Sequence, residues 1–217
     1  MVVKRFMFIR PGETEWNRLN RWQGQVEIPL NVHGIEQAKR LAQFIRPLGI
    51  QTLYSSSLRR ASDTAEILAD ALNTKPIYDQ RLRERHMGEW QGLVLGEIKA
   101  WYPDKYKRLR DHPFEYQIEG GESRRQVMTR VQACFDDILA RGGSETIGIV
   151  SHTTAIMTIV SMLTKNQDAF DLEFSNISVT TVAQESSGDW QITQLNDVSH
   201  LEGMPTLTLG GSGEYDL

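Results

Sequence analysis

The sequence predicts an α/β domain of three layers, in which helices cover both faces of a mainly parallel central sheet. Short apolar runs with strand character alternate with amphipathic stretches of helical length, an order typical of parallel sheets. The run at residues 146–151 is strongly apolar, as expected for a strand that is buried on both faces. The 217 residues, 40% of them hydrophobic, are enough for one complete core.

Three strands are expected in the N-terminal half, at residues 4–9, 52–55 and 76–78. A polar loop follows the first of them. Asn31 is placed to cap a helix that runs to about residue 46. Ser57 is placed to cap a second helix, whose apolar side chains recur at helical spacing as far as Leu72. The segment at residues 81–122 is rich in charge and aromatic side chains and is interpreted as a lid-like insertion.

The C-terminal half continues the alternation of helix and strand. Ser123 begins a helix, the buried strand follows, and Thr153 or Thr154 opens the next helix. Two late strands are expected near residues 177–184 and 191–195. The chain is therefore interpreted as a single domain over residues 1–203, followed by a tail rich in Gly, Ser and Thr at residues 204–217.

Composition excludes several classes of protein. A net charge of −4 argues against nonspecific nucleic-acid binding, and the lack of an apolar stretch of about 18 residues argues against a membrane span. The single cysteine, Cys134, fits a reducing compartment, and residues 1–5 lead into a short strand rather than a signal-peptide core, so a cytoplasmic protein is expected. No zinc spacing or nucleotide-binding glycine motif predicts a metal or cofactor. A homodimer is among the oligomeric states left open.

Four polar motifs stand at or near the expected strand ends, the edge where ligands of parallel sheets bind. They are Arg10-Pro11-Gly12-Glu13-Thr14, Ser55-Ser56-Ser57-Leu58-Arg59-Arg60-Ala61, residues 83–92 with Glu84, and Ser151-His152. Arginine binds phosphate through two hydrogen bonds, and a helix N-terminus attracts anions. A carboxyl group among apolar and aromatic side chains is suited to general acid catalysis. Each motif alone also has an ordinary structural explanation, as a turn, a helix cap, a surface loop or a buried histidine.

Together and in this order, the motifs resemble the histidine phosphatase superfamily, also called the phosphoglycerate mutase-like family. The resemblance covers about residues 3–200. It also includes Glu15-Trp16-Asn17, Trp22-Gln23-Gly24, Pro29-Leu30-Asn31 with Gly34, and Gly120-Gly121-Glu122-Ser123.

The resemblance implies a phosphoglycerate mutase-like fold and a phosphatase that acts on small phosphomonoesters. Its partner would be a small phosphorylated molecule or inorganic phosphate. The residues implied in phosphate binding are Arg10, Asn17, Gln23, Arg60 and His152. Arg60 is selected over Arg59 because it directly precedes the alanine of its motif. Glu84 would protonate the leaving alkoxide and then activate water, and His152 would stabilise the transferring group.

The sequence departs from the family at the nucleophile, where a histidine is replaced by Pro11. Proline has no nucleophilic side chain and no backbone N–H, so no phosphohistidine can form there. Three interpretations follow: a phosphatase that this substitution disables or impairs, a pseudoenzyme that binds phosphorylated ligands or regulates partners, and, less favoured, a mutase. The interval from Glu84 to Gly120 is short for a mutase of the family. Thr153-Thr154, where the family usually has glycine, is a second and milder departure.

Overall fold

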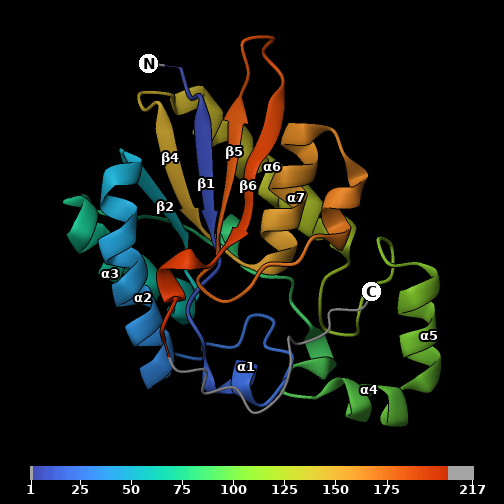
Figure 1. Ribbon diagram of the computed structural model, residues 1–217. Coiled ribbons are helices and arrows are strands. Elements are labelled where there is room, and N and C mark those ends of the chain that lie inside the picture. The colour runs from blue at the N-terminus through green and yellow to red at the C-terminus, as the bar shows by residue number, and fades with distance from the viewer. Residues whose placement is uncertain (1, 205–217) are drawn as a thin grey trace.

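The computed structural model describes residues 2–204, which contain one six-stranded sheet (Figure 1). Its strands are β1 (Arg5–Ile9), β2 (Thr52–Ser56), β3 (Ile77–Asp79), β4 (Thr146–Val150), β5 (Val179–Gln184) and β6 (Trp190–Asp197). The spatial order is β3-β2-β4-β1-β5-β6. The first four strands in this order run parallel, whereas β5 and β6 are antiparallel to their neighbours. The prediction of a mainly parallel sheet is confirmed, with two antiparallel strands at one side.

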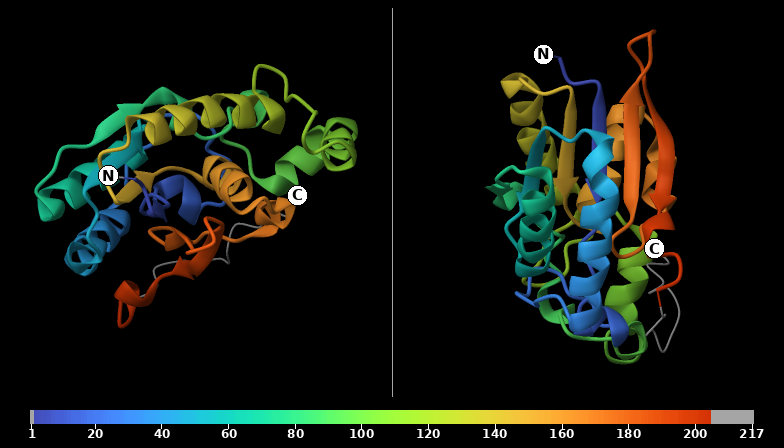
Figure 2. Two further views of the ribbon diagram at one scale, coloured as in Figure 1. Left: turned by 90° about the horizontal axis from the view of Figure 1, so that it is seen from above. Right: turned by 60° about the vertical axis from the view of Figure 1, so that its left-hand side comes forward.

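Helices cover both faces of the sheet. They are α2 (Val32–Ile45) and α3 (Arg59–Leu72) on one face, and α6 (Arg124–Arg141) and α7 (Thr153–Thr164) on the other. Strand β1 contributes side chains to both helical layers, because successive side chains of a strand point to opposite faces of the sheet. Phe6 and Phe8 pack into the α6 and α7 layer, and Met7 and Ile9 into the α2 and α3 layer. The three-layer prediction is confirmed (Figure 2).

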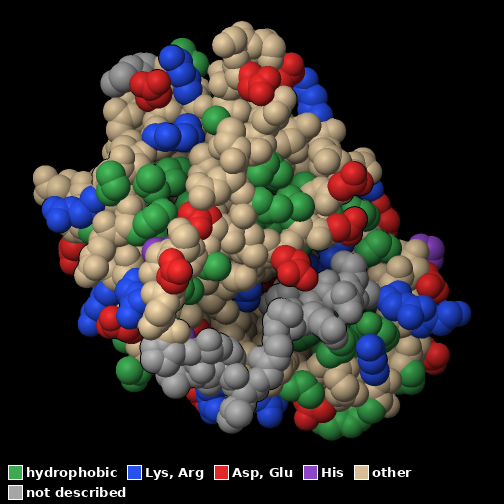
Figure 3. Space-filling view, viewed as in Figure 1, with side chains coloured by type: hydrophobic (Ala, Val, Ile, Leu, Met, Phe, Trp, Pro, Cys, Tyr) green, Lys and Arg blue, Asp and Glu red, His purple; other side chains and the backbone are tan. Residues whose placement is uncertain are grey.

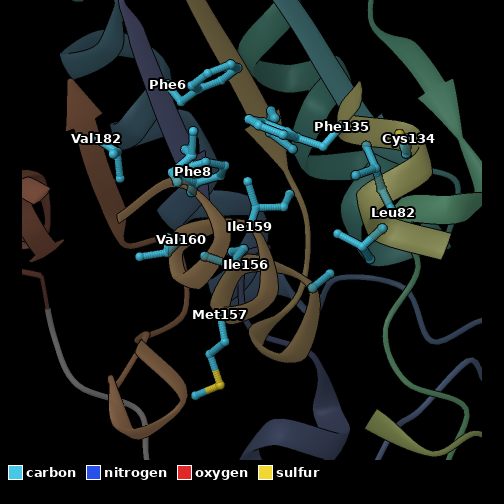
Figure 4. Packing of buried hydrophobic residues seen from close by; sticks show 14 of the residues in the cluster. Phe6, Phe8, Leu82, Cys134, Phe135, Ile156, Met157, Ile159, Val160 and Val182 are labelled. Carbon is cyan, nitrogen blue, oxygen red and sulfur yellow. The ribbon is translucent and has the colours of Figure 1, made fainter. Parts of the chain in front are cut away.

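The core beneath α6 and α7 is built on aromatic side chains (Figure 4). The rings of Phe6 and Phe135 lie 4.8 Å apart between their centroids. Ile156, Ile159 and Val160 of α7 are fully buried beside them. Each such side chain contributes about 1.5–3 kcal/mol through burial, so α7 is firmly held, and with it the residues at its N-terminus.

Three of the four predicted helix starts are confirmed. Asn31 caps α2, Ser123 caps α6, and α7 begins at Thr153. The prediction that Ser57 caps α3 is wrong, because α3 begins at Arg59 and its N-cap, Leu58, offers no side-chain acceptor. The Ser57 hydroxyl instead accepts from Nε of Arg83 at 2.8 Å, and a carboxylate from a distant loop binds the first turn of α3, as described below.

The segment at residues 81–122 lies beyond the end of the sheet (Figure 1). It carries α4 (Leu95–Trp101) and α5 (Pro103–Asp111), which pack around a separate hydrophobic cluster. The buried members of this cluster are Trp22, Trp90, Ile98, Tyr106, Leu109 and Ile118. Backbone packs directly on backbone within the segment, since a Cβ at Gly121 would lie 2.4 Å from the carbonyl oxygen of His86.

The remaining helical elements are short. They are α1 (Glu15–Arg18) and the 3₁₀ helices at Arg46–Leu48, Gln80–Leu82, Gly88–Trp90, Gln167–Asp171 and Ser199–Leu201. The predicted tail at residues 204–217 lies outside the described residues, apart from its first residue. Within residues 2–204, no helix combines the length and apolar character needed to cross a membrane. Acidic and basic side chains are interspersed on the face that Figure 3 shows.

Candidate active site

A cleft lies at the carboxyl ends of the parallel strands. It is lined by Arg10, Pro11, Gly12, Asn17, Gln23, Gly24, Arg60, Glu84, His152, Thr153 and Asn176. All seven residues singled out from the sequence are among them. They meet because β1, β2 and β4 are parallel, so that the chain leaving each strand arrives at the same edge of the sheet. Over residues 2–204, no group of three or more His, Cys, Asp or Glu side chains is arranged to hold a metal ion.

Arg10 directly follows β1. Its backbone N–H donates to the carbonyl oxygen of Ser178 at 3.2 Å, and its guanidinium donates to the carbonyl oxygen of Phe174. The segment before β5 therefore fixes both the backbone and the side chain of Arg10. This arrangement holds a positive charge at the strand end.

Pro11 is fixed through its carbonyl oxygen. This oxygen accepts from the backbone N–H of Ile177 at 3.2 Å and from Nδ2 of Asn176 at 3.1 Å. Ile177 has a φ of +60°, which is an outlier for a β-branched residue, and its side chain is fully buried. The packing around Ile177 therefore maintains a costly backbone conformation at the turn that holds Pro11.

Gly12 and Gly34 bring two backbones into direct contact. A Cβ at Gly12 would lie 2.6 Å from the carbonyl oxygen of Gly34, and one at Gly34 would lie 2.1 Å from that of Glu13. The backbone N–H of Gly12 donates to Oγ1 of Thr64 in α3 at 3.2 Å. Helices α2 and α3 thus both hold the loop that lines the cleft.

Arg60 lies in the first turn of α3 and is only 5% exposed. Its guanidinium donates to the carbonyl oxygen of Gly24 at 2.8 Å and of Val26 at 3.2 Å. Arg60 therefore lines the cleft and also fixes the loop that carries Gln23. The Oε1 atom of Gln23 is buried and has no hydrogen-bond partner among the described residues.

Glu84 brings a carboxylate to the N-terminus of α7. Its Oε1 accepts from the backbone N–H of Arg85 at 2.6 Å, and its Oε2 accepts from the N–H of Thr154 at 3.3 Å. The side chain is almost fully buried. A helix N-terminus favours a negative charge, so α7 orients this carboxylate as well as covering the sheet.

His152 is buried at the end of β4, and its Nε2 lies 2.8 Å from Oγ of Ser56. Burial, together with the positive charges of Arg60 and Arg10, holds the pKa of His152 well below its ordinary value. The imidazole is therefore neutral at neutral pH.

Asn17 and Asn176 contact each other across the cleft. Oδ1 of Asn17 accepts from the backbone N–H of Thr14 at 3.0 Å and from Nδ2 of Asn176 at 3.4 Å. Sequence reasoning missed Asn176. The signal that could have found it is topological, because β5 runs antiparallel to β1, so the residues before β5 lie at the same edge as the residues after β1.

Comparison with known proteins settles the family. Residues 6–198 match the histidine phosphatase superfamily (branch 1). The chain belongs to this superfamily. Its membership agrees with the α/β/α architecture and with the position of the cleft at the strand ends.

Relatives within the superfamily differ in their named activities. Phosphoserine phosphatase 1 of Hydrogenobacter thermophilus is 32% identical over 159 residues, which cover 73% of this chain and 75% of the relative. A probable phosphoglycerate mutase of Erwinia tasmaniensis is 34% identical over 201 residues, covering 89% and 93% of the two chains. The structure of a phosphoserine phosphatase mutant from Entamoeba histolytica with phosphoserine aligns with a TM-score of 0.79 at 28% identity, covering 91% and 98%. The phosphoglycerate mutase-like fold is thus confirmed.

Proposed function

We propose that this histidine phosphatase superfamily member binds small phosphomonoesters in the cleft, and that Pro11 stands at the position of the nucleophilic histidine and disables hydrolysis. One observation carries the proposal. Two arginines, a buried histidine and a carboxylate line a single cleft together with Pro11. These are the groups that phosphoryl transfer needs, apart from the nucleophile.

Each group has a distinct role in this proposal. Arg10 and Arg60 neutralise the phosphoryl oxygens, and Asn17 and Gln23 complete the binding of phosphate. His152 is neutral beforehand and gains a proton more readily beside a bound dianion. Glu84, which also lines the cleft, is the group that protonates the leaving alkoxide. Pro11 offers neither a side-chain nucleophile nor a backbone N–H.

The named relatives support this substrate class. One is a phosphoserine phosphatase, and the Entamoeba histolytica structure is that of a histidine-to-alanine mutant with phosphoserine bound. That mutant binds its ligand although it lacks a histidine. Phosphoserine is accordingly the first ester to test, both as a ligand of this chain and as a substrate of its variants.

The decisive experiment is Pro11→His. We expect the unmodified chain to hydrolyse phosphoserine and p-nitrophenyl phosphate little or not at all. The variant should gain about three or more orders of magnitude in kcat, because a lost nucleophile disables groups that act as a unit. It should also form an acid-labile phosphoenzyme. Pro11→Ala is the matched control, since it frees the backbone N–H without supplying a nucleophile, and it should stay inactive.

A second function is favoured by Pro11 itself. The chain would then be a binding or regulatory protein that recognises phosphorylated ligands without turnover. A Pro11→His variant whose imidazole points into the cleft in a crystal structure, yet which hydrolyses no ester, would support this function and contradict the first.

A mutase activity, suggested by the Erwinia tasmaniensis relative, is tested by phosphate transfer between the hydroxyl groups of phosphoglycerate in the same variant.

A further inference from the structure

Behind Glu84, outside the cleft, lies Arg130 of α6. Its Nη1 donates to the carbonyl oxygens of Arg81 at 2.8 Å and Arg83 at 2.7 Å, and its Nη2 donates to that of Glu84 at 2.8 Å. One guanidinium thus binds three carbonyl groups of the segment that delivers Glu84. Arg130 is not among the residues that line the cleft.

Glu122 completes this arrangement. It pairs with Arg130 at 2.8 Å and 2.9 Å, and its Oε2 also accepts from the backbone N–H of His86 at 2.9 Å. Gln25 donates to the same Oε2 at 3.3 Å and to the carbonyl oxygen of Glu84 at 2.9 Å. Burial acts to raise the pKa of Glu122, but hydrogen bonds from Arg130 and His86 outweigh it and hold this pKa below its ordinary value. Glu122 is therefore ionised.

The segment needs these partners because it has no regular structure of its own. The 3₁₀ helix at Gln80–Leu82 ends just before Arg83, and the next one begins at Gly88. The carbonyl groups of Arg83 and Glu84 accept from side chains rather than from the backbone of a strand or helix, and buried carbonyl groups require partners. Arg130 and Gln25 provide those partners, and so determine where the backbone of Glu84 lies.

We propose that the ion pair of Arg130 and Glu122 is a positioning device for Glu84. It fixes the backbone on both sides of Glu84, and so holds the carboxylate between the N–H groups of Arg85 and Thr154 at the wall of the cleft. Arg130 acts through Glu84 and is a positioning residue rather than a catalytic one. This inference rests on the proposed function, in which Glu84 protonates the leaving group.

The test introduces further substitutions into the Pro11→His variant and compares the hydrolysis of two esters. Phosphoserine has a poor leaving group that needs protonation, whereas p-nitrophenyl phosphate has a good one that does not. The double variant Arg130→Met/Glu122→Gln removes the pair without leaving a buried charge unpaired. Glu84 also activates water in the second step, which both esters share, so the comparison uses kcat/KM, which reports the steps up to departure of the leaving group. Because general acid catalysis contributes about 10²–10⁴-fold, we expect kcat/KM to fall about tenfold or more on phosphoserine and far less on p-nitrophenyl phosphate. Glu84→Gln should show the same selectivity more strongly.

A matched control is Arg125→Met, which removes an exposed arginine of the same helix, paired with Glu115 at the surface. It should change neither rate. Arg130→Lys keeps the charge but cannot reach three carbonyl groups, so it should fall between the parent and the double variant. An equal loss of kcat/KM on both esters in the double variant would overturn the positioning role, since a merely structural defect lowers both values together.

Hydrogen exchange, measured in variants that retain Pro11, separates this inference from the proposed function. The N–H of Arg85 donates to Glu84 and not to Glu122, so it reports where the Glu84 carboxylate lies. We expect this amide to exchange faster in Arg130→Met and to stay protected in Arg125→Met. Unchanged exchange in Arg130→Met would overturn the positioning role. Faster exchange alongside an inactive Pro11→His variant would uphold it while the proposed function fails.

Discussion

His152 shows how burial fixes the charge of a single residue and links it to acid stability. Its folded-state pKa is depressed, so the unfolded chain takes up a proton near pH 6.5 whereas the folded chain does not. The contribution of neutral His152 to the free energy of unfolding is therefore fully present above this pH. It falls by up to about 1.4 kcal/mol per pH unit as the pH drops below about 6.5.

Urea unfolding at pH 7.5 and 5.5 measures this dependence. We expect His152→Gln to lose most of the difference that the parent shows between the two pH values. His200 is half-buried and burial lowers its pKa too, so both proteins should carry His200→Gln to isolate the effect of His152. An identical loss of stability in both proteins would mean that His152 is already protonated in the folded state.

Individual residues also mark the limit of prediction from sequence at this site. The seven predicted residues were assigned through the resemblance to the superfamily, which rests on motifs with a recognisable residue pattern. Asn176 and Ile177 have no such pattern. Their importance comes from hydrogen bonds to Pro11, some 165 positions earlier in the chain, and from a backbone conformation that the residue type Ile does not suggest.

Among the elements, α3 has its first backbone N–H group, that of Arg59, bound by a distant side chain. Oε2 of Glu27 accepts from the backbone N–H of Arg59 at 2.8 Å, and its Oε1 lies 3.7 Å from Nη2 of Arg83. A carboxylate at this position replaces an N-cap and also interacts favourably with the helix dipole. The loop that Arg60 fixes is therefore attached to α3 twice, once by Arg60 and once by Glu27.

Replacing Glu27 tests this attachment. We expect Glu27→Ala to lower the free energy of unfolding by about 0.5–2 kcal/mol, the usual cost of a lost N-cap. The loss should shrink at about 1 M NaCl, because salt screens a half-exposed charge. Glu36→Ala, which removes an exposed glutamate from α2, is the matched control in chemical denaturation. A loss no larger than that of the control would show that α3 does not depend on Glu27.

Elements were predictable wherever the signal is local. Short runs with strand character, between stretches of helical length, indicated all six strands, and the caps at Asn31 and Ser123 located the starts of α2 and α6. Ser57 was a wrong choice because a capping rule considers only neighbouring residues, whereas Glu27 arrives from a loop some 30 positions earlier. Gly34 is unfavourable inside a helix by propensity alone, and its reason is tertiary, since only glycine lets α2 approach Glu13 so closely.

For the molecule as a whole, the cleft joins segments from both ends of the chain. Arg10 and His152 follow the two central strands, Arg60 belongs to α3, and Asn176 precedes β5. A ligand that contacts all of them must stabilise the complete fold, because the unfolded chain does not assemble the site. Ligand binding should therefore be visible as thermal stabilisation even without turnover.

We expect inorganic phosphate to raise the Tm of the unmodified chain. At about 100 times its Kd the ligand adds about 2.7 kcal/mol to the free energy of unfolding. Arg60→Ala should abolish the shift, whereas Arg59→Ala, which removes the exposed neighbour of Arg60, should preserve it. Differential scanning fluorimetry at increasing phosphate concentrations measures both. A shift that survives Arg60→Ala would indicate that phosphate acts elsewhere on the molecule.

The layers of the molecule were predictable, but the order of its strands was not. Alternating strands and helices indicate a parallel sheet, and the buried run at residues 146–151 indicates a central strand. Nothing in the periodicity of the sequence places β1 between β4 and β5, because that order depends on contacts between segments far apart in the chain. The position of the cleft followed from the strand ends alone and did not require the order.

The position of β1 in the sheet also bears on how the protein is made. β1 leaves the ribosome before its partners β4 and β5, which lie some 140 and 175 residues further along the chain. At about 5–20 residues per second, this strand waits roughly 7–35 s for neighbours with which to pair. Its apolar residues, Phe6 to Ile9, lack these partner strands throughout that interval. A newly synthesised chain therefore depends on chaperones, or on transient shielding by α2 and α3, until β4 and then β5 emerge.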